Sequence, residues 1–174
     1  MKKNKFAMIL TVLIGMIWII TPVVTVAAET AHSVQVEATS QAILSQWLAA
    51  GDEAGHSIGM QQRDGEAVFS SGETAKYSTV STFDSRRNKG GTAQGYSKFT
   101  FNDGSLIIFS WVAELTRTQE GLPFNQGRGT IIKGTGRFEG IRGGSVFKGQ
   151  QLKSAADDPK LTAGQSATIT YTLP

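Results

Sequence analysis

The sequence predicts an all-β protein of roughly eight strands, built as a sandwich or an up-and-down barrel, with one short helix before most of them. Runs rich in Val, Thr, Phe, Tyr and Ser alternate between apolar and polar residues, which is the period of a strand. Residues typical of tight turns separate the runs, so neighbouring strands are expected to be antiparallel. Strands and helices do not alternate along the chain, which argues against a doubly wound nucleotide-binding fold.

The first residues are interpreted as a secretory signal peptide over residues 1–28. A basic head precedes an apolar run from Phe6 to Ile20, and Val26 and Ala28 occupy the −3 and −1 positions of a cleavage site. The alternative is an uncleaved anchor helix, since about 20 apolar residues can span a bilayer. We expect cleavage after Ala28, export to a periplasm or out of the cell, and no membrane contact afterwards.

Charge and residue content exclude several functions. Lys2, Lys3 and Lys5 are three of the 17 basic residues, so 14 basic residues remain after cleavage against 14 acidic ones. Arg86, Arg87 and Lys89 do cluster, but they flank Gly90-Gly91 and are interpreted as a solvated turn. A neutral chain of this kind predicts no nucleic-acid partner. The chain has no cysteine, which excludes thiol catalysis and thiolate metal sites. With only His32 and His56 as imidazoles, we expect no metal and no cofactor.

Residues 29–54 are expected to form an N-terminal segment ahead of the barrel. "SVQVEATS" alternates from Val34 to Ala38 and predicts a short strand. In "SQAILSQWLAAG" the period changes to that of a helix, which Thr39 or Ser40 can cap and Gly51 can end. The helix is expected to pack on the rest of the domain through one apolar face. That face consists of Ile43, Leu44, Trp47 and Leu48.

Residues 55–174 are expected to form the barrel. "SIGMQQ" meets a hairpin signal at Asp64-Gly65, and "EAVFSSG" follows as the next strand. "AKYSTVSTFDS" alternates strictly, and "RRNKGG" turns the chain into "TAQGYSKFTF". Asn102-Asp103-Gly104 is the clearest hairpin turn. It leads into "SLIIFSWVAELTRT", which is apolar on both faces from Leu106 to Val112 and is predicted to be central.

The last third of the chain surrounds a glycine-rich stretch, "KGTGRFEGIRGG" at 133–144. Strands are predicted on either side of it, in "GRGTIIKGTG" and "SVFKGQQLK", and "SATITYTL" closes the chain with strict alternation. A phosphate-binding loop needs glycines that open a helix, whereas a strand follows here. Glycine inside strands marks bulges and barrel corners. We therefore predict a bend and one short turn that plugs the barrel end with Phe138 and Ile141.

The same stretch, together with "GYSKFTFNDGS" upstream, resembles the allene oxide cyclase/dirigent-like barrels over roughly Gly95 to Leu152. The resemblance implies a calycin-like, eight-stranded antiparallel closed barrel whose mouth holds a small apolar molecule. Plant members cyclise an unstable epoxide or steer radical coupling, mostly by shaping and shielding the ligand. No catalytic residue of those enzymes can be matched to a position here. The matching positions are structural: Gly134, Gly136, Phe138, Gly140, Ile141, Gly143 and Gly144.

Few residues offer chemistry. Glu114 is the candidate catalytic group: inside a barrel its carboxyl would act as acid or base, and at the rim it would be a solvated charge. The same two alternatives, a position inside the barrel or a solvated position at the rim, apply to Asp84, which ends its strand. Four aromatic residues are candidates either for lining a ligand pocket or for the core. They are Tyr77, Tyr96, Phe99 and Trp111.

The leading hypothesis is an exported, non-enzymatic barrel that binds a small apolar ligand in its mouth. The first alternative is a cyclase- or isomerase-type enzyme that acts by confinement, with Glu114 as its polar group. The second is an interaction protein with a filled core, which would show edge strands or an exposed apolar patch.

Overall fold

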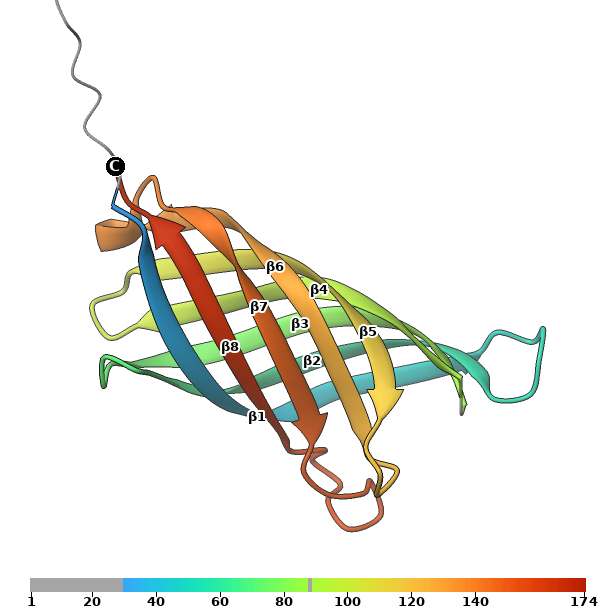
Figure 1. The fold of residues 1–174 in the computed structure, drawn as a ribbon. Coiled ribbons are helices and arrows are strands. Elements are labelled where there is room, and N and C mark those ends of the chain that lie inside the picture. The colour runs from blue at the N-terminus through green and yellow to red at the C-terminus, as the bar shows by residue number, and fades with distance from the viewer. Residues whose placement is uncertain (1–29, 88) are drawn as a thin grey trace, which may run out of the picture.

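The computed structural model describes residues 30–87 and 89–174, which form a closed antiparallel barrel of eight strands (Figure 1). Each strand pairs with the next along the chain, and β8 returns to pair with β1. The fold is therefore an up-and-down barrel rather than a sandwich. The predicted signal peptide lies outside the described residues. In chain order the elements are β1 His32–Ala49, β2 His56–Phe69, β3 Thr74–Arg86, β4 Gly90–Phe101, β5 Leu106–Arg117, β6 Pro123–Thr135, the 3-10 turn η1 Gly136–Phe138, β7 Arg142–Gln151 and β8 Ala163–Thr172.

Closure gives every strand two hydrogen-bonded neighbours, so no strand is central. Alternation decides which side chains enter the barrel. In β5, Ile107 and Phe109 are buried inside, while Val112 is exposed on the outer face. The clearest sequence turn is confirmed: Gly104 has a φ of 82°, and the carboxylate of Asp103 accepts a hydrogen bond from the backbone N–H of Ser105 at 2.9 Å.

The core fills the end of the barrel that carries η1. Phe69 packs on Phe99 and Phe101 at centroid distances of 5.4 and 5.1 Å, and Phe101 packs on Phe138 at 4.8 Å. Phe138 and Ile141 are both buried here, which is the plug expected from the glycine-rich stretch. The bend before it uses Gly136 at a φ of 62°, a conformation that favours glycine. This end of the barrel is thus packed shut.

The predicted N-terminal helix is wrong, because those residues are the second half of β1. The register of β1 against β2 shifts between Ala42 and Leu44, which marks a β-bulge. A bulge inserts one residue and changes the phase of alternation. The alternation of inward and outward side chains therefore shifts by one residue within β1. As a result, apolar residues fall at positions 43, 44, 47 and 48, a spacing that resembles that of a helix. The barrel accordingly begins at His32 rather than at residue 55.

The predicted hairpin at Asp64-Gly65 is also wrong, since β2 runs through both residues without a turn. Gly65 serves close backbone approach instead: a Cβ there would lie 1.9 Å from the carbonyl oxygen of Thr39 on β1. One long strand therefore replaces two short ones. The exchange moves Arg63 from an expected turn to the wall of the barrel.

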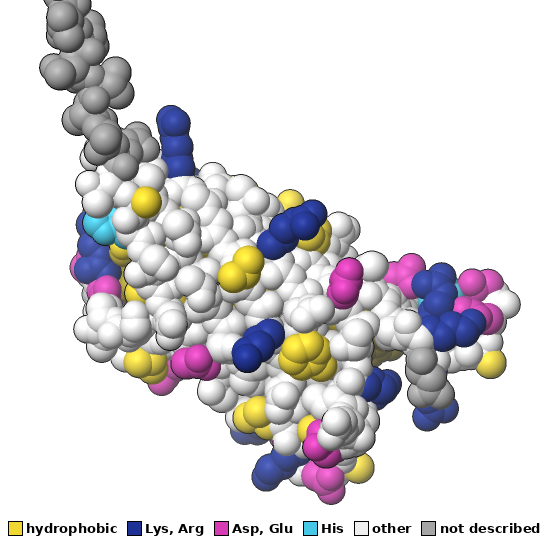
Figure 2. All heavy atoms as spheres, viewed as in Figure 1, with side chains coloured by type: hydrophobic (Ala, Val, Ile, Leu, Met, Phe, Trp, Pro, Cys, Tyr) yellow, Lys and Arg dark blue, Asp and Glu magenta, His cyan; other side chains and the backbone are white. Residues whose placement is uncertain are grey.

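On the face shown in Figure 2, apolar side chains are scattered over the barrel wall and charged side chains gather where the β1–β2 turn projects. Large apolar residues on the outer face include Val80, Tyr96, Val112, Ile132 and Val146. No helix within residues 30–87 and 89–174 is long and apolar enough to cross a membrane.

Candidate ligand-binding cavity

A cavity of about 900 Å³ occupies the half of the barrel that lies away from η1. Its floor is formed by Phe99, Phe109 and Ile169, which also belong to the core. Ligand sites commonly occupy about 300–1,000 Å³, so the space suits a small molecule. The mouth lies between the four loops that join β1 to β2, β3 to β4, β5 to β6 and β7 to β8. Lining residues in three of these loops mark it, namely Gly55, Lys89 and Ala155, and Arg117 at the end of β5 marks the fourth side.

Short inward-facing side chains keep this half of the barrel open. Along β3, the buried aromatic ring of Tyr77 is followed inside by Thr79 and Ser81. Ser97 on β4 and Ala167 on β8 line the same space. An eight-stranded barrel is just wide enough either to fill with side chains or to hold one small ligand. Because the inward-facing residues of this half are small, space for a ligand remains.

A layer of hydroxyl and amide groups crosses the cavity at the level of Tyr77. The Tyr77 hydroxyl donates to Oε1 of Gln165 at 2.9 Å, and the Ser97 hydroxyl donates to Oγ1 of Thr79 at 3.2 Å. Burial raises the pKa of Tyr77 above its ordinary value, because a phenolate would lose its hydration there. The phenol therefore stays neutral and can donate a hydrogen bond.

Arg63 brings a positive charge into the same layer. Its Nε donates to Oγ of Ser40 at 3.2 Å, and its Nη1 donates to Oε1 of Gln61 at 3.0 Å. Its Nη2 donates to the backbone carbonyls of Ser40, at 3.2 Å, and Leu161. Burial lowers the pKa of Arg63, although an arginine remains protonated at physiological pH. The guanidinium is thus held in place by β1, β2 and the β7–β8 loop.

Three of the four aromatic candidates line this cavity, namely Tyr77, Phe99 and Trp111. Tyr96 belongs neither to the pocket nor to the core, the two alternatives considered for it, because its side chain is 60% exposed on the outer face. The indole of Trp111 packs edge-on against Phe147 at 5.7 Å. Among the described residues, its Nε1 is the buried side-chain polar atom without a hydrogen-bond partner.

Neither carboxylate candidate reaches the cavity. Glu114 is exposed and faces outward with Val112, beside a shallow groove on the outer wall. Asp84 also faces outward, where it accepts hydrogen bonds from His56 and Arg86.

Sequence reasoning missed Arg63, Gln61 and Gln165. The signal was present in β2, because residues 61 and 63 share the parity of Ala67 and Phe69, which are buried inside. Reading Asp64-Gly65 as a turn interrupted that parity and hid it. No comparable signal marks Gln165, whose approach to Tyr77 depends on β8 lying across the barrel.

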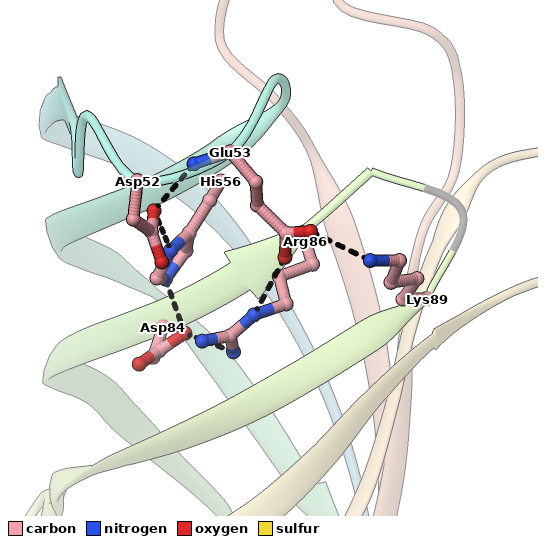
Figure 3. A network of polar contacts seen from close by, with 6 residues as sticks. All are labelled: Asp52, Glu53, His56, Asp84, Arg86 and Lys89. Atoms are coloured by element: carbon pink, nitrogen blue, oxygen red, sulfur yellow. Dashed lines mark hydrogen bonds and ion pairs between the residues drawn. The ribbon is translucent and has the colours of Figure 1, made fainter.

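A polar network stands at the rim of the mouth and ties the β1–β2 turn to the end of β3 (Figure 3). His56 is only 7% exposed, and its Nδ1 lies 2.6 Å from Asp52 Oδ1 while its Nε2 lies 2.9 Å from Asp84 Oδ1. Arg86 then links Asp84 to Glu53, which also pairs with Lys89 at 2.6 Å. The hydrogen bond to Asp52 raises the pKa of His56, and the same bond lowers the pKa of Asp52.

This network predicts a pH-dependent contribution to stability. The raised pKa means that protonated His56 stabilises the fold below the unfolded value of about 6.5, and that this contribution is lost as pH rises through the folded pKa. The Asp52 contribution is present above about 3.9 and is lost as pH falls through its lowered folded pKa. We therefore expect His56 and Asp52 both to stabilise the fold between about pH 3.9 and pH 6.5.

The measurement is the denaturant midpoint at several pH values between 5 and 9, compared between the native chain and His56→Gln. We expect the native chain to unfold at a higher denaturant midpoint than the variant at low pH, and this difference in midpoint to shrink as pH rises above 6.5. His32→Gln is the matched control, because His32 lies at the opposite end of β1, stacked on Tyr171 at 5.1 Å. A difference in denaturant midpoint of equal size at pH 5 and pH 9 would contradict the prediction.

Within the described ranges, no group of three or more His, Cys, Asp or Glu residues is arranged to hold a metal ion. The site is therefore built from aromatic rings, hydroxyl and amide groups and one deeply placed guanidinium. Such a set can shape a ligand, donate hydrogen bonds and attract negative charge.

No family model matches the chain, and no curated protein matches it. Among solved structures, the chain is similar to a pterocarpan synthase dirigent protein, with a TM-score of 0.45 and 15% sequence identity. That match covers 83% of this chain and 88% of the other. A match at this level identifies no family and no activity.

Proposed function

We propose that this protein is exported and binds a small molecule with a large apolar part inside the open half of its barrel. The observation that carries the proposal is the cavity of about 900 Å³, closed at one end by the aromatic core and open at the other. Aromatic rings such as Phe83, Trp111 and Phe147 offer the apolar contact area. The hydroxyl and amide layer supplies the few polar groups that orient ligands in such sites.

The two alternatives are less well supported. A cyclase or isomerase acting through Glu114 would need its carboxylate in the cavity, and Glu114 faces outward. A filled-core interaction protein would have no cavity of this size. We therefore propose binding without assigning a reaction.

A neutral fluorescent dye tests the proposal. N-phenyl-1-naphthylamine is expected to bind the chain as its host produces it, with a fluorescence increase that saturates at one dye per chain. Ala167→Phe fills part of the cavity from β8 and should weaken dye binding roughly tenfold, a loss of about 1.4 kcal/mol. Val146→Phe is the matched control, because Val146 is 64% exposed on the outer wall.

Equal affinity in both variants would place the dye outside the barrel and contradict the proposal. A thermal melt of each variant shows whether it is folded at the assay temperature. Native mass spectrometry of chain purified gently from its host would then identify a retained ligand by its mass.

A further inference from the structure

The cavity has a strong asymmetry of charge. Among the described residues that line it there is no Asp and no Glu. The cationic lining residues are Arg63, Arg86, Arg87, Lys89 and Arg117. Arg86 and Lys89 are neutralised by carboxylates at the rim, and Arg117 donates to the backbone carbonyl of Gly121 at 2.7 Å. Arg63 is the one that sits deep, beside Tyr77.

The partners of Arg63 fix its position without balancing its charge. All four of its hydrogen bonds go to neutral oxygens: one hydroxyl, one side-chain amide and two backbone carbonyls. Within residues 30–87 and 89–174, no carboxylate lies within 4.0 Å of it. Asp158 acts on Arg63 from a longer distance, but its carboxylate accepts hydrogen bonds from the backbone N–H groups of Lys160 and Thr162 in its own loop.

A purely structural role does not require this charge. Arg63 is half-buried. A cation that is partly withdrawn from water costs free energy unless it is paired, and a neutral donor could tie β1 to the β7–β8 loop without that cost. A guanidinium has five N–H groups, and the four bonds leave one on Nη1 for a ligand. An anion entering the cavity would gain both that hydrogen bond and the uncompensated charge.

We propose that the ligand is an amphipathic monoanion, with one carboxylate held by Arg63 and an apolar or aromatic body lying against Phe83 and Phe147. The inference rests on the proposed function, because it names the chemical class of the molecule that the cavity binds. Arginine suits this role because its charge is permanent and the remaining N–H on Nη1 can donate to a carboxylate oxygen. The neutral Tyr77 phenol and the Gln165 amide stand beside it as further hydrogen-bonding groups.

Two compounds of nearly the same shape, one anionic and one neutral, test the inference. Naphthalene-2-carboxylate and naphthalene-2-carboxamide are titrated as competitors of N-phenyl-1-naphthylamine on the full chain. We expect the carboxylate to displace the dye at a concentration roughly tenfold lower than the amide. Arg63→Gln should reduce this ratio to about one, and Arg63→Lys should retain most of it because the charge is kept. Arg128→Gln removes an equal charge from the outer face and should leave the ratio unchanged.

The outcomes of this titration distinguish a failure of the charge inference from a failure of the proposed function. If the neutral dye binds the native chain but the carboxylate shows no advantage, the inference is overturned and the proposed function stands. A preference that survives in Arg63→Gln also overturns the inference, since the charge would then act from the rim. If the neutral dye does not bind at all, the proposed function fails and the inference with it. Should Arg63→Gln not fold, the native ratio and Arg63→Lys still decide.

Discussion

Replacing Gly136 by valine is expected to lower the free energy of unfolding by about 3 kcal/mol or more. Two costs add. Gly136 has a φ of 62°, where a β-branched residue is strained. A Cβ at this position would also lie 2.4 Å from Oγ of Ser105. That hydroxyl cannot rotate away freely, since it accepts from the backbone N–H of Arg137 at 3.2 Å and donates to Asp103 at 3.0 Å.

Gly104→Val separates the two costs. Gly104 has a φ of 82°, but a Cβ there would meet nothing within 4 Å. We expect this control to lose only the strain energy, about 1–2 kcal/mol. Urea denaturation of both variants and the native chain measures the difference. A Gly136→Val protein with unchanged melting would refute the account of the glycine-rich stretch as a required bend.

Replacing Phe138 by alanine is expected to lower the free energy of unfolding by about 3–5 kcal/mol, the usual cost for a buried phenylalanine. Phe138 is 8% exposed and packs on Phe101, and the guanidinium of Arg137 lies 4.8 Å from the centroids of both rings. Removing the ring opens a cavity in the packed end that its rigid neighbours cannot fill.

The comparison is Phe83→Ala, which removes the same ring from the hollow end. Phe83 is half-buried beside Trp47, with a centroid distance of 5.4 Å, and its other side faces the cavity. We expect a loss below about 1.5 kcal/mol, because fewer contacts disappear. Equal losses in thermal or urea unfolding would contradict a barrel divided into a packed end and a hollow end.

Much of the barrel could be predicted because strand periodicity is a local property. The strict alternation of β8 places Ile169 inside and Thr170 outside in the structure, as the sequence indicates. The turn at Gly104 and the plug of Phe138 and Ile141 follow from glycine positions whose backbone conformation other residues rarely adopt.

The predicted N-terminal helix and the predicted hairpin at Asp64-Gly65 are wrong for the same reason. The bulge near Leu44 and the close approach at Gly65 are responses of one strand to its neighbour across the β1–β2 ladder. A bulge imitates a change of period, and a glycine needed for close approach imitates a turn residue. Both features depend on pairing partners far along the chain, so the residues themselves carry no distinguishing signal.

Local patterns in the sequence are enough to predict that the chain is all-β, that its turns are tight, and which residues of each regular strand face the same side, because these depend on steric preferences of neighbouring residues. Three features become visible only in the folded barrel: β1 and β8 pair to close it, one end is packed while the other is hollow, and Arg63 lies beside Tyr77 in the hollow end. The physical reason is that side chains meet across a barrel through strand tilt and register, which are set by backbone hydrogen bonds between distant segments.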